Sequence, residues 1–232
     1  MELLNFDDTG YGDELLAGLS VTVRLAVASF VLSLVLGIII GLVAISRNRI
    51  IQGGWRAYVS LFMGVPSILV VFFVYYNLPV FLKSAFDLRM AVSPFLAGLI
   101  ALGVVYAAYV AEVVRGAVLN IPQEQFDAAR ALGLRKLHMW WFVILPLVWR
   151  IALPGLTNVW MTVLKDTALV SLVGLNDLVR MADVAAAVTR KPFLFYIVVA
   201  VVFVLFAGVT GVGAKKIERR VNRGQEHPKE LQ

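Results

Sequence analysis

Residues Phe126 to Arg150 read FDAARALGLRKLHMWWFVILPLVWR, a basic, Ala-rich stretch in a chain that is otherwise strongly apolar. Its Arg and Lys side chains occur too often for it to cross a bilayer, because a membrane-spanning helix needs about 20 consecutive, mostly apolar residues. The stretch is therefore expected to lie outside the hydrocarbon. What it does there depends on the rest of the chain.

The composition of the 232-residue chain is that of a membrane protein, since 60% of the residues are hydrophobic and only 16% are charged. Strands of alternating polarity bounded by turn signals are not found in the sequence, so a β-barrel is not predicted. Four charge-free runs are each long enough to cross the hydrocarbon core as a helix. They are Leu25–Ser46, Ala57–Leu82, Met90–Ala111 and Pro192–Ala214.

A further crossing is predicted over Ile151–Asn176, although Lys165 and Asp166 interrupt its apolar sequence. With five spans and the N-terminus outside, 14 Lys and Arg residues fall on the cytoplasmic side and five or six fall outside. Without this crossing the basic tail after residue 214 would lie outside, against the positive-inside rule. We therefore predict an all-α protein with five transmembrane helices, N-terminus out and C-terminus in.

Several classes of protein are not supported by the residues present. With no cysteine and only two distant histidines, His138 and His227, neither a thiolate site nor a histidine metal centre is predicted. Gly208 and Gly213 have the spacing of a phosphate loop, but Ala214 stands where the loop needs Lys. The first 14 residues hold five acids and no Lys or Arg, so no signal peptide is expected. The net charge of +6 is assigned to cytoplasmic loops and not to nucleic-acid binding.

Two motifs within the spans predict how the helices pack and where they break. Gly37 and Gly41 form a GxxxG pattern, which lets another helix approach closely. Pro66 and Pro79 each lack a backbone donor and are expected to kink or end their helices.

The loop after the third span is predicted to hold two short helices joined by glycine. Asn120 is the expected N-cap, Pro122 suits the first turn, and Gly133 is the expected left-handed residue after the first helix. The second helix is expected to end at Pro146. The small side chains of Ala128, Ala129 and Ala131 suit insertion into a groove on another protein. Alternatively the segment lies on lipid headgroups, with Trp140 and its neighbour Trp141 as an aromatic anchor.

This loop resembles the EAA loop of ATP-binding-cassette (ABC) importer permeases. The family pattern is Glu-Ala-Ala, three residues, Gly, nine residues, Ile, one residue and Leu-Pro. It falls here on Asp127-Ala128-Ala129, Gly133, Val143 and Leu145-Pro146, with Asp in place of Glu and Val in place of Ile. In this family the loop forms the coupling helix that docks on a separate ATPase. The resemblance implies coupling contacts for Phe126, Asp127, Ala128, Ala129, Gly133, Leu134, Leu145 and Pro146.

The resemblance extends over roughly residues 19–220 and points to the polar amino-acid permeases. WRIALPGLTNVWMTVLKDTALVSLVGLNDL and YAAYVAEVVRGAVLNIP are similar to segments of the membrane subunits of histidine and arginine importers. Met63 departs from the Arg that the family often has there. The family implies a type I importer permease fold: an extracytoplasmic segment 1–18, a permease domain 19–220 with its coupling loop at 120–146, and a cytoplasmic tail 221–232.

The same resemblance implies the partners of the chain. It predicts a multi-pass subunit of the bacterial inner membrane, surrounded by lipid, that is not an enzyme and binds neither cofactor nor nucleic acid. An ABC ATPase subunit would use the ATP, a second permease chain of the same or a homologous sequence would complete the pathway, and an extracytoplasmic solute-binding protein would deliver the solute.

Ionisable residues inside a span are costly to insert, so Lys165 and Asp166 are candidates for the solute path. They fall in the least regular crossing, and interrupted helices often form midplane sites. A structural ion pair, or a helix break with both side chains reaching water, would explain them equally. Glu112 has Arg115 three residues later as a partner. The candidate path residues are Glu112, Asn158, Lys165, Asp166 and Thr167.

The function predicted from these observations is import of a polar, basic amino acid: arginine, histidine, lysine or ornithine. Glutamine, glutamate and opine-type solutes are the alternatives within the family. An ion-coupled secondary carrier that uses Lys165 and Asp166 would need an internal repeat, and none is evident in the sequence. A membrane-embedded enzyme would need clustered carboxylates, His or Ser–Lys pairs, and no such cluster is evident.

Overall fold

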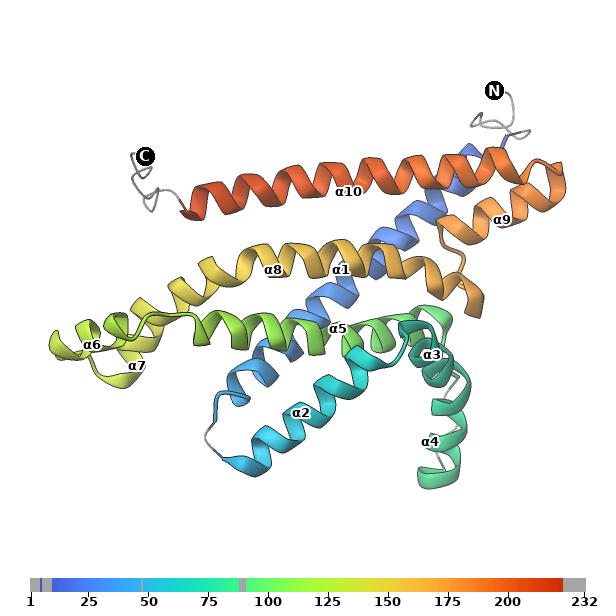
Figure 1. Cartoon of the computed structure of the whole chain (residues 1–232). Helices are drawn as coiled ribbons and strands as arrows, with labels where there is room; N and C mark the ends of the chain where they lie inside the picture. The colour runs from blue at the N-terminus through green and yellow to red at the C-terminus, as the bar shows by residue number, and fades with distance from the viewer. Residues whose placement is uncertain (1–4, 6–9, 47, 88–90, 223–232) are drawn as a thin grey trace.

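The structure, a computed structural model, describes residue 5 and residues 10–46, 48–87 and 91–222, and these residues form helices and short connections without a strand. Figure 1 shows α5, α8 and α10 running alongside one another, with α1 crossing them. The elements are α1 (Gly12–Val43), α2 (Arg49–Gly64), α3 (Ser67–Phe72), the π-helix η2 (Phe73–Asn77), α4 (Leu78–Phe86), α5 (Pro94–Leu119), α6 (Gln123–Ala131), α7 (Lys136–Met139), the π-helix η3 (Trp140–Ile144), α8 (Leu145–Asp166), the 3-10 helix η4 (Thr167–Val173), α9 (Leu178–Thr189) and α10 (Pro192–Asn222).

Five helical segments within the described residues are long and apolar enough to cross a membrane, which confirms the predicted number. The interrupted crossing predicted over Ile151–Asn176 is part of a single continuous helical run that begins at Lys136 and ends at Gly174, where φ is 89°. The segments are Gly12–Val43, Ser67–Phe86, Pro94–Leu119, Lys136–Val173 and Pro192–Val221.

The second span differs from its prediction. The charge-free run Ala57–Leu82 is not one helix, because α2 ends at Gly64 and a new helix begins at Ser67. Pro66 causes the break: its ring disfavours the helical conformation in the preceding residue, and Val65 is extended at ψ 130°. As a result, the membrane-length segment begins after the proline, and α2 precedes it as a separate helix.

Two Leu-Pro sequences are each preceded by a π-helix, η2 before Leu78-Pro79 and η3 before Leu145-Pro146. In each case the Leu N–H donates to the carbonyl five residues back, at Phe73 or Trp140. The wider turn accommodates a proline that has no N–H and whose ring would otherwise crowd the preceding turn. The prediction that the helix ends at Pro146 is therefore wrong, because the chain continues through it into α8.

The packing centre is the contact between α1 and α5. A Cβ added to Gly37 would collide with Val110 and lie 2.8 Å from the Ala107 carbonyl oxygen, and one added to Gly41 would lie 2.8 Å from that of Ala111. Both glycines therefore bring α1 against the backbone of α5, as the GxxxG pattern predicts.

The short helix α9 is fastened to α1. Asp177 is its N-cap and accepts a hydrogen bond from the Arg180 N–H at 2.9 Å, while the Thr22 hydroxyl of α1 accepts one from the Leu178 N–H at 3.1 Å. Asp177 is fully buried against Gly18 of α1, and its Oδ2 makes no hydrogen bond to the described residues. Burial raises the pKa of the Asp177 carboxyl from 3.8 to about 6.

The domain boundaries predicted from the sequence do not coincide with element ends. The boundary between residues 18 and 19 lies inside α1, and the one between residues 220 and 221 lies inside α10. Residues 223–232 of the predicted tail and the acids at positions 2, 7 and 8 lie outside the described residues.

Candidate functional site

The segment predicted to couple the chain to an ATPase forms a helix and a tight turn. Gly133 has φ 71°, its N–H donates to the Arg130 carbonyl at 2.9 Å, and the Leu134 N–H donates to the Ala129 carbonyl at 3.2 Å. This pair of bonds is a Schellman motif, so the predicted role of Gly133 at the end of the helix is confirmed. The predicted N-cap is wrong: Asn120 ends α5, and its side-chain amide donates to the Gly116 carbonyl at 2.8 Å.

The side chains of this segment divide into inward and outward sets. Ala129 is only 2% exposed and Phe126 packs against the core, so both hold α6 against the rest of the chain. Asp127 and Ala128 are exposed, and Asp127 pairs with Arg130 at 2.9 Å. The side chain of Ala129 thus faces inward, whereas its neighbours Asp127 and Ala128 face outward.

Leu132 is a residue that the sequence analysis missed. Its side chain is 79% exposed at the start of the turn, directly before Gly133. The signal was its position between the helix and the left-handed glycine, where a side chain projects from the end of α6. Of the other predicted coupling residues, Leu134 and Leu145 are half-buried and Pro146 is exposed. The last two belong to the continuous helix η3–α8 and not to the turn.

Four polar and aromatic side chains, three residues apart, form a ridge along α5, which we call the α5 ridge: Tyr106, Tyr109, Glu112 and Arg115. The rings of Tyr106 and Tyr109 are 5.4 Å apart, and Glu112 Oε2 lies 3.7 Å from Arg115 Nη1. The spacing makes each residue a neighbour of the next on the helix surface. A spacing of three also turns the ridge gradually around α5, so its two ends face different helices.

One end of the α5 ridge meets α8. The buried Tyr106 hydroxyl donates a hydrogen bond of 2.6 Å to Oδ2 of Asp166. No ion pair joins Lys165 to Asp166 among the residues that the structure describes, so the structural ion pair considered from the sequence is not formed. The partner of Asp166 is a tyrosine sixty residues away in the chain.

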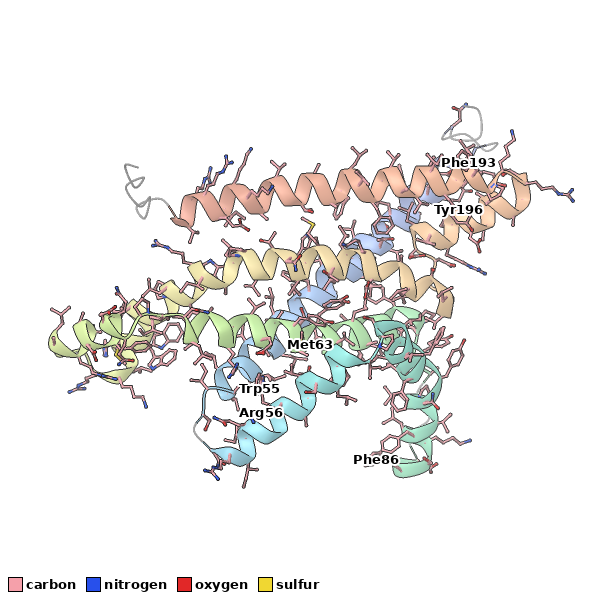
Figure 2. The ribbon with its side chains drawn as sticks, viewed as in Figure 1. Trp55, Arg56, Met63, Phe86, Phe193 and Tyr196 are labelled. Atoms are coloured by element: carbon pink, nitrogen blue, oxygen red, sulfur yellow. The ribbon has the colours of Figure 1, made fainter. Side chains whose placement is uncertain are left out.

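The other end of the α5 ridge meets α2. The guanidinium carbon of Arg115 lies 4.4 Å from the centroid of the Trp55 ring, and the side chains of Arg115 and Glu112 are 31% and 38% exposed. Figure 2 shows Trp55 on α2, below the half-exposed Met63. Trp55 was not predicted as a site residue, because nothing local to it signals a contact with residue 115.

The remaining residues predicted to line a path lie on α8 and η4. Asn158 and Lys165, seven residues or about two turns apart, are both exposed on one face of α8. Thr167 is instead fully buried, and its hydroxyl donates to the Leu164 carbonyl at 2.7 Å. Of the candidate path residues, Glu112 belongs to the α5 ridge and Asp166 is hydrogen-bonded to it through Tyr106. Asn158 and Lys165 are exposed on α8, and Thr167 is buried.

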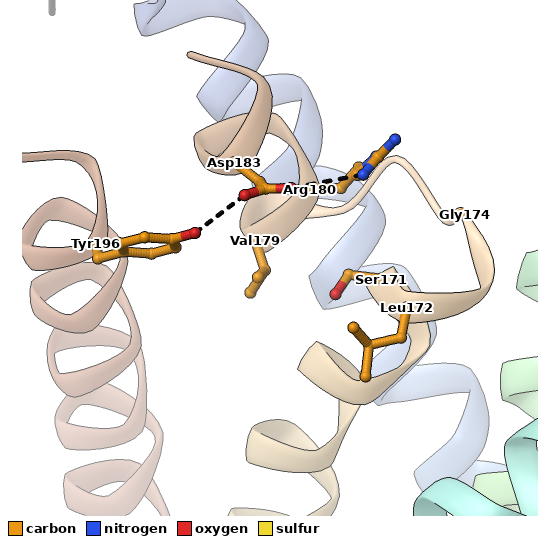
Figure 3. A pocket seen from close by; sticks show the side chains of 7 residues that line it. All are labelled: Ser171, Leu172, Gly174, Val179, Arg180, Asp183 and Tyr196. Atoms are coloured by element: carbon orange, nitrogen blue, oxygen red, sulfur yellow. Dashed lines mark hydrogen bonds and ion pairs between the residues drawn. The ribbon is translucent and has the colours of Figure 1, made fainter. Parts of the chain in front are cut away.

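A separate pocket of about 320 Å³ lies between η4, α9 and α10 (Figure 3). Its charges are engaged with one another: Arg180 Nη1 lies 3.5 Å from Asp183, and the Tyr196 hydroxyl donates to Asp183 at 2.9 Å. We therefore assign the pocket no solute. It is lined by Ser171, Leu172, Gly174, Val179, Arg180, Asp183 and Tyr196.

Comparison with known proteins identifies the family. Residues 33–223 match the model of the binding-protein-dependent transport system inner membrane component. The chain belongs to this family. It is therefore a membrane transport subunit, a permease of an amino-acid ABC importer, and not an enzyme. Membership implies an ATPase and a solute-binding protein as partners, and it disfavours the self-contained ion-coupled carrier.

Curated relatives of this permease cover nearly its whole length. It is 35% identical to the nopaline transport system permease protein of Agrobacterium fabrum, over 97% of this chain and 98% of that one. It is 35% identical to the arginine ABC transporter permease protein of Escherichia coli K12, over 90% and 94%. It is 34% identical to the histidine/lysine/arginine/ornithine transport system permease protein of the same strain, over 93% and 96%.

Solved structures agree with this assignment. The permease superposes on a chain of the crystal structure of an amino acid ABC transporter with histidines, with a TM-score of 0.80 and 28% identity, over 90% of this chain and 95% of that one. A chain of the MetNI methionine ABC transporter in an inward-facing conformation gives a TM-score of 0.74 at 21% identity, which shows the shared fold. The predicted type I importer fold is confirmed.

Proposed function

We propose that this permease imports a solute with a basic side chain, of the class that contains arginine, across the inner membrane of a bacterium. The observation that carries the proposal is the group of relatives at 34–35% identity, whose names include nopaline, arginine and histidine/lysine/arginine/ornithine transport. Arginine and nopaline both contain a guanidinium group, so a solute with this cation is the chemistry that the relatives have in common. Glutamine and glutamate lack it.

The α5 ridge and the open face of α8 are the proposed solute path. The ridge presents two phenol rings, one carboxylate and one guanidinium along the middle and end of α5. Asn158 and Lys165 add an amide and an ammonium on α8. These groups can hydrogen-bond the amino and carboxylate groups of an amino acid, in a region where unpaired charge is costly.

The exposed turn at the end of α6 is the proposed contact with the ATPase. Leu132 and Ala128 give it a small apolar surface, Asp127 and Arg130 flank it, and the Schellman motif at Gly133 gives the turn a defined shape. ATP would bind and react only on the partner, and the chain itself would hold no cofactor. The turn is continuous with α8, so a displacement of α6 would reach the helix that carries Asp166.

The complete importer is proposed to contain two permease chains, two ATPase subunits and a solute-binding protein. The second permease is either a copy of this chain or a homologous one. In the predicted N-out orientation, the solute-binding protein would dock on the side where α9 connects to α10. The loaded binding protein would open the path from that side, and ATP binding and hydrolysis would alternate the access.

The first experiment is purification of the tagged permease from its native membrane together with its bound subunits. ATP hydrolysis is then measured with the solute-binding fraction and single solutes. We expect hydrolysis to rise with arginine, or with nopaline if the solute is an opine, and not with glutamine. If no ATPase accompanies the permease, the coupling proposal is wrong; a rise with glutamine alone would contradict the proposed solute class.

The coupling turn is tested by two substitutions at one position. A Cβ at Gly133 would meet no atom of this chain within 4 Å, but φ 71° strains any other L-residue, so the control must share that strain and differ in side-chain size. We expect Gly133→Trp to insert normally but to abolish solute-stimulated ATP hydrolysis. Gly133→Ala is the matched control, since Ala shares the strain of the left-handed conformation but has a small side chain, and it should retain most of the activity. Full activity in Gly133→Trp would show that the turn does not contact the ATPase.

A further inference from the structure

The end of the α5 ridge that faces α2 contains a cation in a cage built from an aromatic ring and a carboxylate. Trp55 supplies the ring at 4.4 Å from the guanidinium of Arg115, and Glu112 supplies the carboxylate at 3.7 Å. An aromatic face and a carboxylate are both groups that proteins use to bind a guanidinium or ammonium group. The cation held there belongs to the chain itself.

The cage does not satisfy all of its polar atoms. Glu112 Oε2 and Trp55 Nε1 are both buried, and neither makes a hydrogen bond to any residue that the structure describes. At 3.7 Å the contact between Arg115 and Glu112 is an ion pair without a hydrogen bond. Buried polar atoms are nearly always hydrogen-bonded, so the free Glu112 oxygen indicates that Arg115 is not an ideal partner for this carboxylate. The indole N–H needs an acceptor, which no guanidinium can supply.

We infer that the Trp55–Glu112 cage is a binding site for the basic side chain of the transported solute, and that Arg115 is an internal competitor for it. The inference rests on the proposed transport of a basic solute. A solute guanidinium that entered the cage would displace Arg115 and could bond the free Glu112 oxygen. When Arg115 returned to the cage it would expel the solute, which keeps binding weak enough for release.

The position of the cage in the fold suits this role. Glu112 and Arg115 lie in the last two turns of α5, at the end predicted to be cytoplasmic, and their side chains are about one-third exposed. The path along the α5 ridge from Tyr106 ends at this point. A site here would be the last that the solute meets before it leaves the membrane.

The test is equilibrium binding of radiolabelled arginine to the purified importer complex, without the solute-binding protein. Arg115→Gln removes the competitor, so we expect it to tighten arginine binding about tenfold. Glu112→Gln removes the carboxylate of the cage, so we expect it to weaken arginine binding about tenfold. Binding of labelled glutamine, which has no cationic side chain, should not respond to Arg115→Gln. Arg56→Gln is the matched control, because Arg56 is the exposed neighbour of Trp55 and should change neither affinity.

Weaker or unchanged arginine binding in Arg115→Gln would overturn the inference and leave Arg115 as a clamp between α2 and α5. If this variant does not assemble, Arg115→Met decides the question, since it keeps most of the length of the side chain and removes the cation. Unchanged or weaker arginine binding in Arg115→Met would reject the cage. Arginine-stimulated ATP hydrolysis, measured on the same wild-type preparation, tests the proposed function separately, because it depends on the importer and not on this cage.

Discussion

The helices α5 and α10 are both long and apolar, yet they occupy opposite environments. In the most apolar stretch of α5, 61% of the residues are buried, whereas the corresponding share in α10 is 11%. Side-chain size distinguishes them: the buried face of α5 is rich in Ala and Gly, and the exposed face of α10 carries Phe, Ile, Leu and Val. Small residues allow close helix contacts in a membrane, while large ones suit contact with lipid. Apolarity predicts that a helix crosses the membrane, and the small residues determine its depth in the bundle.

The contrast is sharpest for two glycines. Gly37 of α1 lies against Val110 and the Ala107 carbonyl of α5, whereas a Cβ at Gly208 of α10 would meet nothing within 4 Å. We expect Gly37→Leu to separate α1 from α5, to cost more than about 3 kcal/mol and to prevent recovery of a monodisperse protein. Gly208→Leu should leave yield and Tm unchanged. Equal yields from the two variants, measured by size-exclusion chromatography and thermal unfolding in detergent, would remove the packing distinction.

Two aspartates near α9 differ in burial, and therefore in how they should make the stability of the protein depend on pH. Asp177 faces α1 and is fully buried, whereas Asp183 faces α10 with a side chain that is 51% exposed. The pKa of Asp177 is raised to about 6, so its favourable contribution to the folded state is present below about pH 4 and lost as the pH rises through 6.

Asp177→Asn keeps the capping oxygen but stays neutral. We expect this variant to be more stable than the wild type above pH 6, by up to roughly 2–3 kcal/mol, and equally stable near pH 4. The measurement is Tm between pH 4 and 8. Asp183→Asn should show no such trend. A difference between wild type and Asp177→Asn that does not change with pH would mean that the buried carboxyl does not titrate in this range.

The smallest effect is expected for two tyrosines, each of which donates to an aspartate. Tyr106 of α5 is 2% exposed and bonds Asp166 at 2.6 Å, while Tyr196 of α10 is 47% exposed and bonds Asp183 at 2.9 Å (Figure 3). Tyr106→Phe leaves a part-buried carboxylate without its donor, and we expect a loss of about 1–2 kcal/mol. Tyr196→Phe should change stability by less than about 0.5 kcal/mol, because water can replace the hydroxyl. The measurement is the thermal unfolding of both variants. A larger loss of stability in Tyr196→Phe than in Tyr106→Phe would contradict the assignment of α5 as the inner helix and α10 as the outer one.

Local sequence was sufficient wherever the cause of a feature lies within a few residues. Four crossings follow from the length of the apolar runs, the left-handed turn from Gly133, and the close approach of α1 from the spacing of Gly37 and Gly41. The fifth crossing needed the distribution of Lys and Arg over the whole chain. Where two local signals conflicted, prediction failed. Pro66 was judged able to break a helix, yet the run Ala57–Leu82 was still counted as one span; Pro146 was expected to end a helix that a π-helix carries through.

The tertiary structure decided the contacts between residues far apart in the chain. That Asp166 bonds Tyr106 and not Lys165, that Arg115 lies on Trp55, and that Ala129 faces inward while Leu132 projects outward depend on how the helices dock. A sequence pattern records which residues share a face of one helix, because the helix period is constant. It does not record which other helix that face meets, because docking depends on side-chain shapes summed over whole helix surfaces. The sequence alone therefore determined a five-span permease with a left-handed turn at Gly133, and the packing of α5 determined which distant residues its polar side chains contact.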